Sequence, residues 1–306
     1  VVHKSVIGSY MKENKYKGRV RRWLIEIVVF VVAIFAIFTV ISHFLIRPAG
    51  SELSNKDLKS ALTQKRLNYV AIGDSLTEGV GDQTNQGGFI PLLSNAISEI
   101  SDVNVVSQNF GVAGNTSTQI YKRMTKEKKI QSAIKKADVI TITVGGNDVM
   151  KVIRTQLTNL TENSFEKPAQ TYQKQLTEIF DFIRDNNPNA QVYVLGIYNP
   201  FYLNFPDITE MQDIINHWNQ TTQETIAQQK QMYFVPINDL LYQGVNGSKG
   251  VTTSDGEVQT ITNNALFEED HFHPNNIGYQ IMSDAVAEVH SFPTRRSSDL
   301  IGRASC

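Results

Sequence analysis

The amino-acid sequence predicts an α/β fold: a three-layer α/β/α sandwich built on a mostly parallel five-stranded sheet and preceded by one N-terminal transmembrane helix. Two observations lead to this prediction. From Leu67 onward, short apolar runs alternate with helix-like segments, and residues 24–46 of the 306-residue chain are almost wholly apolar. Alternation of this kind is typical of parallel strands joined by right-handed crossovers, with helices on both faces of the sheet.

The apolar run predicts a membrane anchor over residues 24–46. As a helix it would be roughly 35 Å long, enough to cross a hydrocarbon core of about 30 Å. Lysine and arginine are frequent before it, and only Arg47 follows closely. This bias predicts a single-pass protein of the cell membrane, with residues 1–23 cytoplasmic and the rest of the chain extracytoplasmic. A cleaved signal peptide is the alternative, but its apolar region usually runs about 7–15 residues, and "SHFLIRPAG" is a poor cleavage site.

Two further boundaries divide the rest of the chain. Residues 47–66 are polar and predict a tether, and residues 67–290 form the main domain. The stretch "FPTRRSSDLIGRA", residues 292–304, resembles a translated sequencing adapter, so residues 291–306 are interpreted as a non-native tail. The single cysteine, Cys306, lies in this tail, so no internal disulfide is expected.

The secondary structure of the main domain follows from its apolar runs and their period. Strands are predicted over residues 68–73, 103–110, 138–145, 191–198 and 232–237. Helices are predicted over residues 89–100, 117–136, 172–187, 208–230 and 278–289. The polar stretch 242–264 predicts a surface loop.

The composition excludes some classes of function. The chain is 41% hydrophobic and 19% charged, with a formal net charge of −1. This is ordinary globular composition, and it gives no electrostatic reason to expect a nucleic-acid partner. His271 and His273 stand close together, but no H-E-x-x-H or comparable ligand cluster accompanies them. We therefore expect neither a metal nor another cofactor.

Unusual loops follow the first three predicted strands. They read "GDSLTEG", "NFGVAGNTS" and "GGND". In sheets of this kind the ligand crevice lies outside the carboxyl ends of the strands. These three loops are therefore expected to converge in space.

Ser75 stands where the first predicted strand ends and a turn begins. From this segment alone the residue could be a helix cap or a nucleophile, because serine and aspartate are the default residues at helix starts. A serine nucleophile needs a base, and the base works best when a carboxylate orients it. The stretch "EEDHFHPNN" supplies the candidates Asp270, His271 and His273. The three-residue offset between Asp270 and His273 would let the carboxylate meet one imidazole nitrogen in a turn. Given these partners, we expect Ser75 to serve both as cap and as nucleophile.

These motifs, in this order, resemble those of the SGNH, or GDSL-type, hydrolase family over residues 67–289. The resemblance implies a flavodoxin-like sheet and a catalytic triad of Ser75, His273 and Asp270. It also implies that the Ser75 N–H, the Gly114 N–H and the Asn147 side-chain amide form the oxyanion hole. Gly111 is the alternative to Gly114.

The resemblance implies a serine esterase, lipase or acylhydrolase that acts through an acyl-enzyme. With the anchor, this predicts a membrane-bound extracytoplasmic enzyme. Its substrate would be a lipid acyl ester, a thioester or an O-acetyl ester of a glycan, carried on a small molecule or a polymer.

Two alternative functions remain. One is a non-catalytic envelope binding or scaffold protein that keeps the fold, and the other is a flavodoxin-like phosphate or flavin binder. The G-x-S-x-G elbow of α/β-hydrolases is not matched, because Thr77 stands at its last position.

Several residues in these motifs have simpler structural explanations. Gly114 could merely permit a left-handed turn, and Asn147 could cap a helix. Asp74 and Asp148 are interpreted as braces of the loops, and His271 as a structural or rim residue. A group of aromatic residues after the fourth strand could line an acyl or sugar pocket or simply pack in the core: Tyr198, Phe201, Tyr202 and Phe205.

Overall fold

The computed structural model describes residues 65–155, 161, 163–200, 210–243, 251–255 and 258–289. The predicted anchor over residues 24–46 and the predicted tail over residues 291–306 lie outside these residues. Among the helices that the structure describes, none combines the length and the apolar character needed to cross a membrane.

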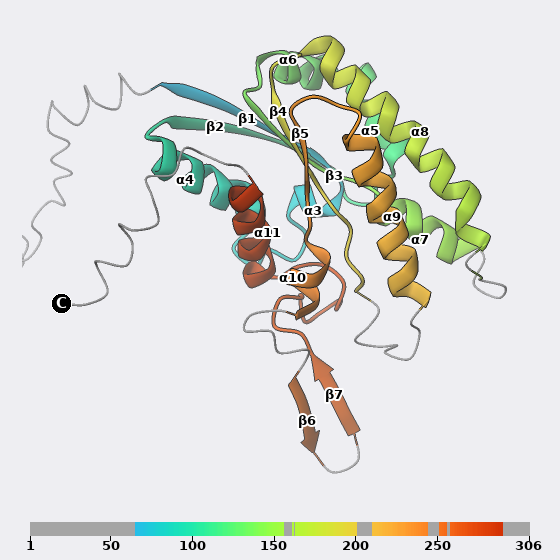
Figure 1. Ribbon diagram of the computed structural model, residues 1–306. Helices are drawn as coiled ribbons and strands as arrows, with labels where there is room; N and C mark the ends of the chain where they lie inside the picture. Colours follow the sequence, from blue (N-terminus) through green and yellow to red (C-terminus); the bar gives the residue numbers. More distant parts are fainter. Residues whose placement is uncertain are drawn as a thin grey trace, which may run out of the picture. The chain divides into compact units, whose positions relative to one another are not determined.

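Five parallel strands form the central sheet, in the order β2-β1-β3-β4-β5 (Figure 1). The strands are β1 (Arg66–Gly73), β2 (Asn104–Gly111), β3 (Val139–Thr143), β4 (Gln191–Leu195) and β5 (Met232–Val235). This order is the flavodoxin-like one, with β2 and β3 on opposite sides of β1. The predicted parallel five-stranded α/β fold is confirmed.

Burial along the strands explains their sequences. Every residue of β3 is buried, and so are the last five residues of β1, because helices cover both faces of these inner strands. Strand β2 lies at an edge of the sheet and is mostly exposed or half-buried, so it accommodates Ser107, Gln108 and Asn109. Continuous apolar runs therefore mark the centre of this sheet, and mixed runs mark its edge.

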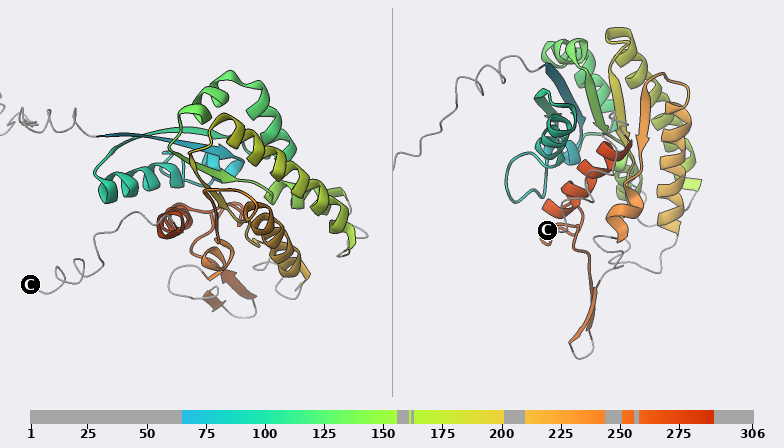
Figure 2. Two further views of the ribbon diagram at one scale, coloured as in Figure 1. Left: turned by 45° about the horizontal axis from the view of Figure 1, so that its top comes forward. Right: turned by 60° about the vertical axis from the view of Figure 1, so that its left-hand side comes forward.

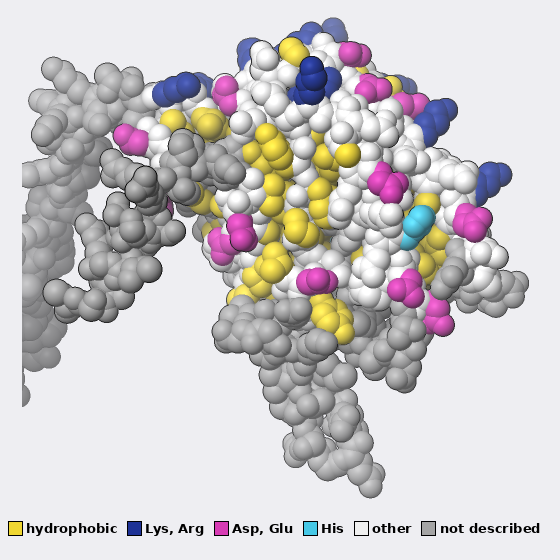
Figure 3. Space-filling model, in the orientation of Figure 1, with side chains coloured by type: hydrophobic (Ala, Val, Ile, Leu, Met, Phe, Trp, Pro, Cys, Tyr) yellow, Lys and Arg dark blue, Asp and Glu magenta, His cyan; other side chains and the backbone are white. Residues whose placement is uncertain are grey.

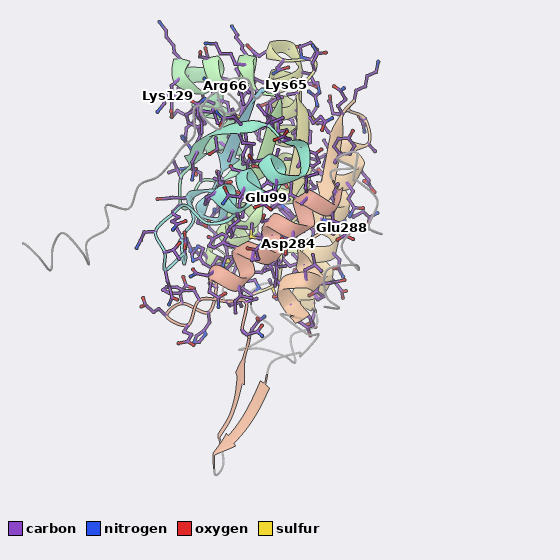
Figure 4. The ribbon with its side chains drawn as sticks, turned by 90° about the vertical axis from the view of Figure 1, so that its left-hand side faces the viewer. Lys65, Arg66, Glu99, Lys129, Asp284 and Glu288 are labelled. Atoms are coloured by element: carbon purple, nitrogen blue, oxygen red, sulfur yellow. The ribbon has the colours of Figure 1, made fainter. Side chains whose placement is uncertain are left out.

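Helices pack on both faces of the sheet. Those of the described chain are α3 (Ser75–Glu78), α4 (Phe89–Ser101), α5 (Ser117–Lys126), α6 (Lys128–Lys136), α7 (Gly146–Thr155), α8 (Asn163–Asn186), α9 (Glu210–Ile226), α10 (Asn238–Gln243) and α11 (Asn276–Val289). Helices α4 and α11 lie side by side on one face, and Figure 4 shows Glu99, Asp284 and Glu288 on this layer. Helices α5, α6, α8 and α9 contribute to a second core on the other face.

Each face has its own hydrophobic core. Phe89 and Leu93 of α4 pack with Tyr279 and Met282 of α11 in one core. The other core includes Trp218 of α9 and residues of α5, α6 and α8. The two cores hold the sheet from both sides and make the three layers.

Basic side chains gather away from the carboxyl ends of the strands. Helix α6 carries Lys128, Lys129, Lys135 and Lys136. Figure 3 shows lysine and arginine side chains along the upper edge of the molecule, the edge on which α6 lies in Figure 1. The loops that follow the strands lie toward the opposite end.

The register of the sheet aligns the three loops of interest. Gly73, the last residue of β1, pairs with Gly111 of β2 and with Thr143 of β3. The loops after these strands therefore start at the same level of the sheet. The convergence predicted from the sequence follows from this register.

Two predicted helices have different bounds in the structure. Residues 117–136 form two helices, because Glu127 has an extended backbone (φ −90°, ψ 107°) and caps both α5 and α6. Helix α8 begins at Asn163, ahead of the predicted start at residue 172, and contains Pro168. Its buried positions Phe165 and Ala169, one on each side of the proline, extend the apolar face toward the start of the helix.

The sequence reading missed four elements. Helix α7 follows directly from the "GGND" motif, and α10 follows β5. The predicted loop over residues 242–264 includes strands β6 (Val251–Asp255) and β7 (Val258–Thr262), which form a separate two-stranded antiparallel sheet (Figure 2). Valine and threonine recur in both strands, which is a typical strand composition that the overall polarity of the stretch conceals.

Asn187 links three segments at the end of α8. Its amide donates to the carbonyls of Ile134 (2.7 Å) and Ala137 (2.8 Å), and its oxygen accepts from the N–H groups of Asn189 (3.1 Å) and Ala190 (3.0 Å). We expect Asn187→Ala to destabilise the domain by about 3 kcal/mol, because buried backbone groups lose their partners. Thermal unfolding should then occur roughly 6–12 °C lower.

The exposed neighbour Asn189 supplies the matched control. Asn189→Ala should change the melting temperature by less than about 2 °C, since surface substitutions usually have small effects. Equal melting temperatures for the Asn187→Ala variant and the original chain would contradict this account of the contact.

Candidate active site

Ser75 is the first residue of α3 and is 7% exposed. The residue that caps this helix is Asp74, whose side chain accepts a hydrogen bond from the Leu76 N–H at 3.1 Å. The expectation that Ser75 itself caps the helix is therefore wrong, because the preceding aspartate takes that position. Within the described residues the Ser75 hydroxyl makes no hydrogen bond, so its oxygen is not committed to holding the turn.

A buried hydroxyl pair supports the turn from below. The Thr143 hydroxyl donates to the Asp74 carboxylate at 2.8 Å and lies 2.8 Å from the Thr77 hydroxyl. Gly73 allows this approach, because a Cβ on it would stand 2.2 Å from the Thr143 Oγ1. Burial raises the pKa of Asp74, while its hydrogen bonds oppose that shift. Asp74 thus connects the end of β3 to the turn that carries Ser75.

The loop after β2 is attached to the same turn. The Val112 N–H donates to the Gly73 carbonyl at 3.0 Å, and the Ala113 N–H donates to the Glu78 carboxylate. A Cβ on Gly111 would stand 2.1 Å from the Glu78 backbone nitrogen, so this glycine permits close packing of β2 against α3. The sequence did not single out Glu78.

Glycine is required at position 114 for a different structural reason than at position 111. Its φ of 77° lies in the left-handed region, and a Cβ built on it would meet no atom within 4 Å. The backbone conformation, and not a lack of space for a side chain, therefore favours glycine at this position. Open space at this position leaves room for another molecule to approach the backbone.

The "GGND" motif joins the loop after β2. The Asn147 amide donates to the Asn115 carbonyl at 3.1 Å, which leaves its second N–H without a partner among the described residues. Asp148 accepts from the Ser117 N–H at 2.9 Å and from the Ser117 hydroxyl at 2.6 Å. Burial raises the pKa of Asp148, and these bonds oppose the rise. The two side chains hold the loops after β2 and β3 against each other.

Asp270 and His273 are brought together in one tight turn. The Asp270 Oδ2 lies 2.6 Å from the His273 Nδ1, and its Oδ1 accepts from the backbone N–H groups of Phe272 (2.9 Å) and His273 (3.0 Å). Burial alone would raise the pKa of Asp270, but these three hydrogen bonds outweigh it and hold the pKa below its ordinary value. The carboxylate therefore remains ionised and fixes the orientation of the imidazole.

His271 is exposed and has a left-handed backbone, with φ of 49°. Its N–H donates to the Phe267 carbonyl at 2.8 Å, which closes the turn. No contact between the His271 ring and the Asp270 carboxylate is present in the described part of the chain. His271 thus contributes to the turn through its backbone N–H.

The turn with His273 packs against the segment that follows Ser75. A Cβ on Gly81 would stand 2.4 Å from the Pro274 carbonyl oxygen and 3.3 Å from the His273 Cβ. The Tyr279 hydroxyl donates to the Val80 carbonyl at 2.6 Å. No hydrogen bond joins the Ser75 hydroxyl to the His273 ring within the described ranges. The structure thus brings the two segments into contact and leaves the side chains of Ser75 and His273 unbonded to each other.

Asp82 organises the segment between α3 and α4. Its Oδ1 accepts from the Thr84 N–H and hydroxyl, and its Oδ2 accepts from the N–H groups of Gln86, Gly87 and Gly88. The sequence reading missed Asp82 and Gly81. The run of glycines in "EGVGDQTNQGG" was the available signal, because repeated glycines mark a backbone that turns sharply.

A narrow pocket lies beside Ser75, with a cavity volume of about 40 Å³. Ser75, Asn147, Tyr198 and Phe272 are among the residues that line it. It therefore lies among the turn that carries Ser75, the "GGND" motif and the residue next to His273. No group of three or more His, Cys, Asp or Glu side chains in the described ranges could hold a metal ion.

A sequence model of the GDSL-like Lipase/Acylhydrolase family matches residues 71–281 of the chain. The uncharacterized protein YpmR of Bacillus subtilis (strain 168) is 32% identical over 228 residues, which cover 74% of this chain and 82% of the relative. The spore germination lipase LipC of Bacillus licheniformis is 27% identical over 230 residues, which cover 71% of this chain and 93% of the relative.

Solved structures share the fold. The lipase Lip_vut3 from a goat rumen metagenome has a TM-score of 0.59 and 26% identity, covering 73% of this chain and 97% of that protein. A catalytic mutant of Axe2, an acetylxylan esterase from Geobacillus stearothermophilus, has a TM-score of 0.52 and 16% identity, covering 76% and 97% of the two chains. At 16% identity, the similarity to Axe2 shows a shared fold and nothing further.

The lowered pKa of Asp270 predicts a loss of stability in acid. Because the pKa is lower in the folded chain than in the unfolded chain, the unfolded chain binds more protons as the pH falls. The contribution of Asp270 to stability is therefore present above about pH 4 and is lost below it. Asp270→Asn should make stability, measured by urea unfolding, less sensitive to acidification between about pH 5 and about pH 3.

Asp185→Asn is the matched control, because it removes one exposed carboxylate that has no hydrogen bond to a described residue. This variant should keep the acid sensitivity of the original chain. If stability fell equally with acid in the Asp270→Asn variant and in the original chain, Asp270 would not be a source of the acid sensitivity.

Proposed function

Because the chain belongs to the GDSL-like Lipase/Acylhydrolase family and is an ester-hydrolysing serine hydrolase, we propose that it cleaves carboxylic esters through an acyl-enzyme formed on Ser75. His273 acts as general base and then as general acid, and Asp270 orients it. The observation that carries this proposal is the 2.6 Å contact between Asp270 and His273, in a turn that packs against the segment following Ser75.

The reaction has two steps. In the first, the Ser75 Oγ attacks the ester carbonyl carbon while its proton passes to the His273 Nε2. The carbon–oxygen bond of the ester then breaks, and the alcohol leaves with that proton. In the second, water attacks the acyl-serine and gives a proton to the same nitrogen, which returns it to the Ser75 Oγ as the carboxylic acid departs. Asp270 stays ionised and stabilises the protonated imidazole.

The negative oxygen of each tetrahedral intermediate needs fixed donors. We assign this role to the Ser75 N–H, the Gly114 N–H and the side-chain amide of Asn147. Support comes from the left-handed φ and the open space at Gly114 and from the second N–H of Asn147. Removing one such donor typically lowers the rate by about 10²–10³-fold.

The enzyme is further proposed to work outside a cell membrane, anchored by residues 24–46 with its N-terminus cytoplasmic. This part rests on the apolar run and the basic residues before it. An anchored enzyme could reach lipid acyl esters and O-acetyl esters of envelope glycans. The similarity to LipC, a spore germination lipase, favours esters as substrates and leaves both classes open.

Ser75→Ala and His273→Ala test the triad. Each should lower kcat for p-nitrophenyl acetate and butyrate by at least about 10³-fold, because the nucleophile and its base act as one unit. His271→Ala is the matched control and should retain most of the activity. Unchanged hydrolysis in both triad variants would defeat the assignment, and loss in Ser75→Ala with retention in His273→Ala would point to His271 as the base.

Covalent labelling separates the esterase from a non-catalytic scaffold. A fluorophosphonate probe should label the original chain and not the Ser75→Ala variant, because only an activated serine reacts with it. A folded original chain without label would favour a binding or scaffold role.

The anchor is tested by fractionation of cells that express the full chain. We expect the chain to stay with the membrane after a carbonate wash, and a variant without residues 24–46 to be released, because a helix of this length inserts effectively irreversibly. Added protease should degrade the main domain of intact spheroplasts. Release of the full chain by carbonate, or protection from protease, would count against the proposed topology.

A further inference from the structure

We propose that the pocket beside Ser75 accepts a short acyl group, of about two to four carbons, and that Tyr198 limits its length. The inference rests on the proposed function, because it takes Ser75 as the residue that is acylated. It concerns the acyl side of the ester, which neither the motifs nor the relatives specify.

The lining of the pocket fits an acyl group and not a sugar. Leu76, Val144, Ile197, Tyr198, Pro200 and Phe272 supply apolar surface. Of the polar groups, the Asp74 carboxylate is occupied by the Leu76 N–H and the Thr143 hydroxyl. A buried sugar hydroxyl would find few partners here, and an unpaired buried polar group is costly. The hydroxylated part of a substrate is therefore expected to lie outside.

The volume of the pocket sets the length of the acyl group. A cavity needs about 10–15 Å³ to hold one water molecule, so a pocket of 40 Å³ is small and suits a short group. A methyl or methylene group is of similar size to a water molecule. Acetyl to butyryl groups would fit, whereas the outer methylenes of a longer chain would stay in water and gain nothing from burial.

Tyr198 is a fixed part of the wall. Its hydroxyl donates to the Phe272 carbonyl, which belongs to the residue just before His273, and its side chain is buried. Burial raises the pKa of Tyr198, so the hydroxyl stays protonated and remains a donor. If the ring turned away, the buried hydroxyl and carbonyl would both lose a partner. The ring is thus a fixed part of the pocket lining and also supports the turn that carries His273.

Between the two substrate classes of the proposed function, this geometry favours acetyl esters of a hydroxylated polymer over long-chain lipid esters. The acetyl methyl would enter the pocket while the polymer remained in solvent. A fatty acyl chain would exceed the space beside Ser75.

The test is an acyl-length series on the full chain, with p-nitrophenyl acetate, butyrate, octanoate and dodecanoate below their micellar concentrations. We expect kcat/KM for octanoate to be no higher than that for butyrate, because the outer methylenes gain nothing from burial. Tyr198→Ala should raise kcat/KM for octanoate relative to kcat/KM for acetate by about tenfold, because the ring no longer occupies part of the pocket. Tyr198→Phe should keep the length profile and lower kcat for every ester, because the ring remains while the Phe272 carbonyl loses its donor.

Two further variants keep the test decisive. Tyr233→Ala removes a tyrosine from β5, away from the pocket residues, and should leave the profile unchanged. Val144→Ala shortens another side chain of the pocket lining with a smaller loss of packing and should also shift the profile toward longer chains, even if Tyr198→Ala does not fold.

Preference of the original chain for octanoate would overturn the inference, and so would an unchanged profile in both Tyr198→Ala and Val144→Ala. Either result would leave the esterase intact, since Ser75→Ala would still abolish hydrolysis. Equal hydrolysis by the original chain and Ser75→Ala would instead reject the proposed function itself. With natural substrates, release of acetate from O-acetylated xylan supports the inference, and release of fatty acid from dioleoylphosphatidylcholine vesicles without acetate contradicts it.

Discussion

The pairing of β1 with its two neighbours is the constraint on which the site depends. Gly73 lies between Gly111 and Thr143, so three loops leave the sheet at one level. The Thr143 hydroxyl bonds to Asp74, and the Val112 N–H bonds to the Gly73 carbonyl. A shift of one residue in either pairing would separate the loops by more than a hydrogen bond can span and would turn side chains to the other face. The sheet therefore determines the positions of Ser75, Gly114 and Asn147 together.

The other half of the site is held differently. Asp270 and His273 are neighbours in sequence, and their contact forms within one turn. Nothing in the sheet pairing places that turn beside Ser75. The contacts that do so are made by side chains: Tyr279 bonds to the Val80 carbonyl and Tyr198 to the Phe272 carbonyl. Gly81 adds a close approach to Pro274 that a side chain would block.

The difference between these halves explains how much the sequence could predict. Apolar runs of inner strands are continuous because both faces are buried, so these strands were predictable. The alternation of strands and helices along the chain predicted that the strands are parallel. Local offsets such as Asp270 to His273 were predictable too. The identity of the helix cap was not, since Asp74 and Ser75 are both good caps and only the backbone geometry selects one. The roles of Glu78, Gly81 and Asp82 depend on which loops touch, and a single sequence does not encode this in any local pattern.

The carboxylates of Glu78 and Asp148 affect the geometry of the site and not the formation of the sheet. Glu78 and Asp148 attach the loop of Gly114 and Asn115 to α3 and α7, and both act through backbone N–H or side-chain donors of that loop. The sheet would still form without them, because its strands pair independently of these carboxylates. What they hold in place is the loop that carries Gly114 and Asn115, next to the turn of Ser75. Under the proposed function, the donors to the negative oxygen act only when their geometry is fixed in advance, so Glu78 and Asp148 would contribute to the rate through position and not through proton transfer.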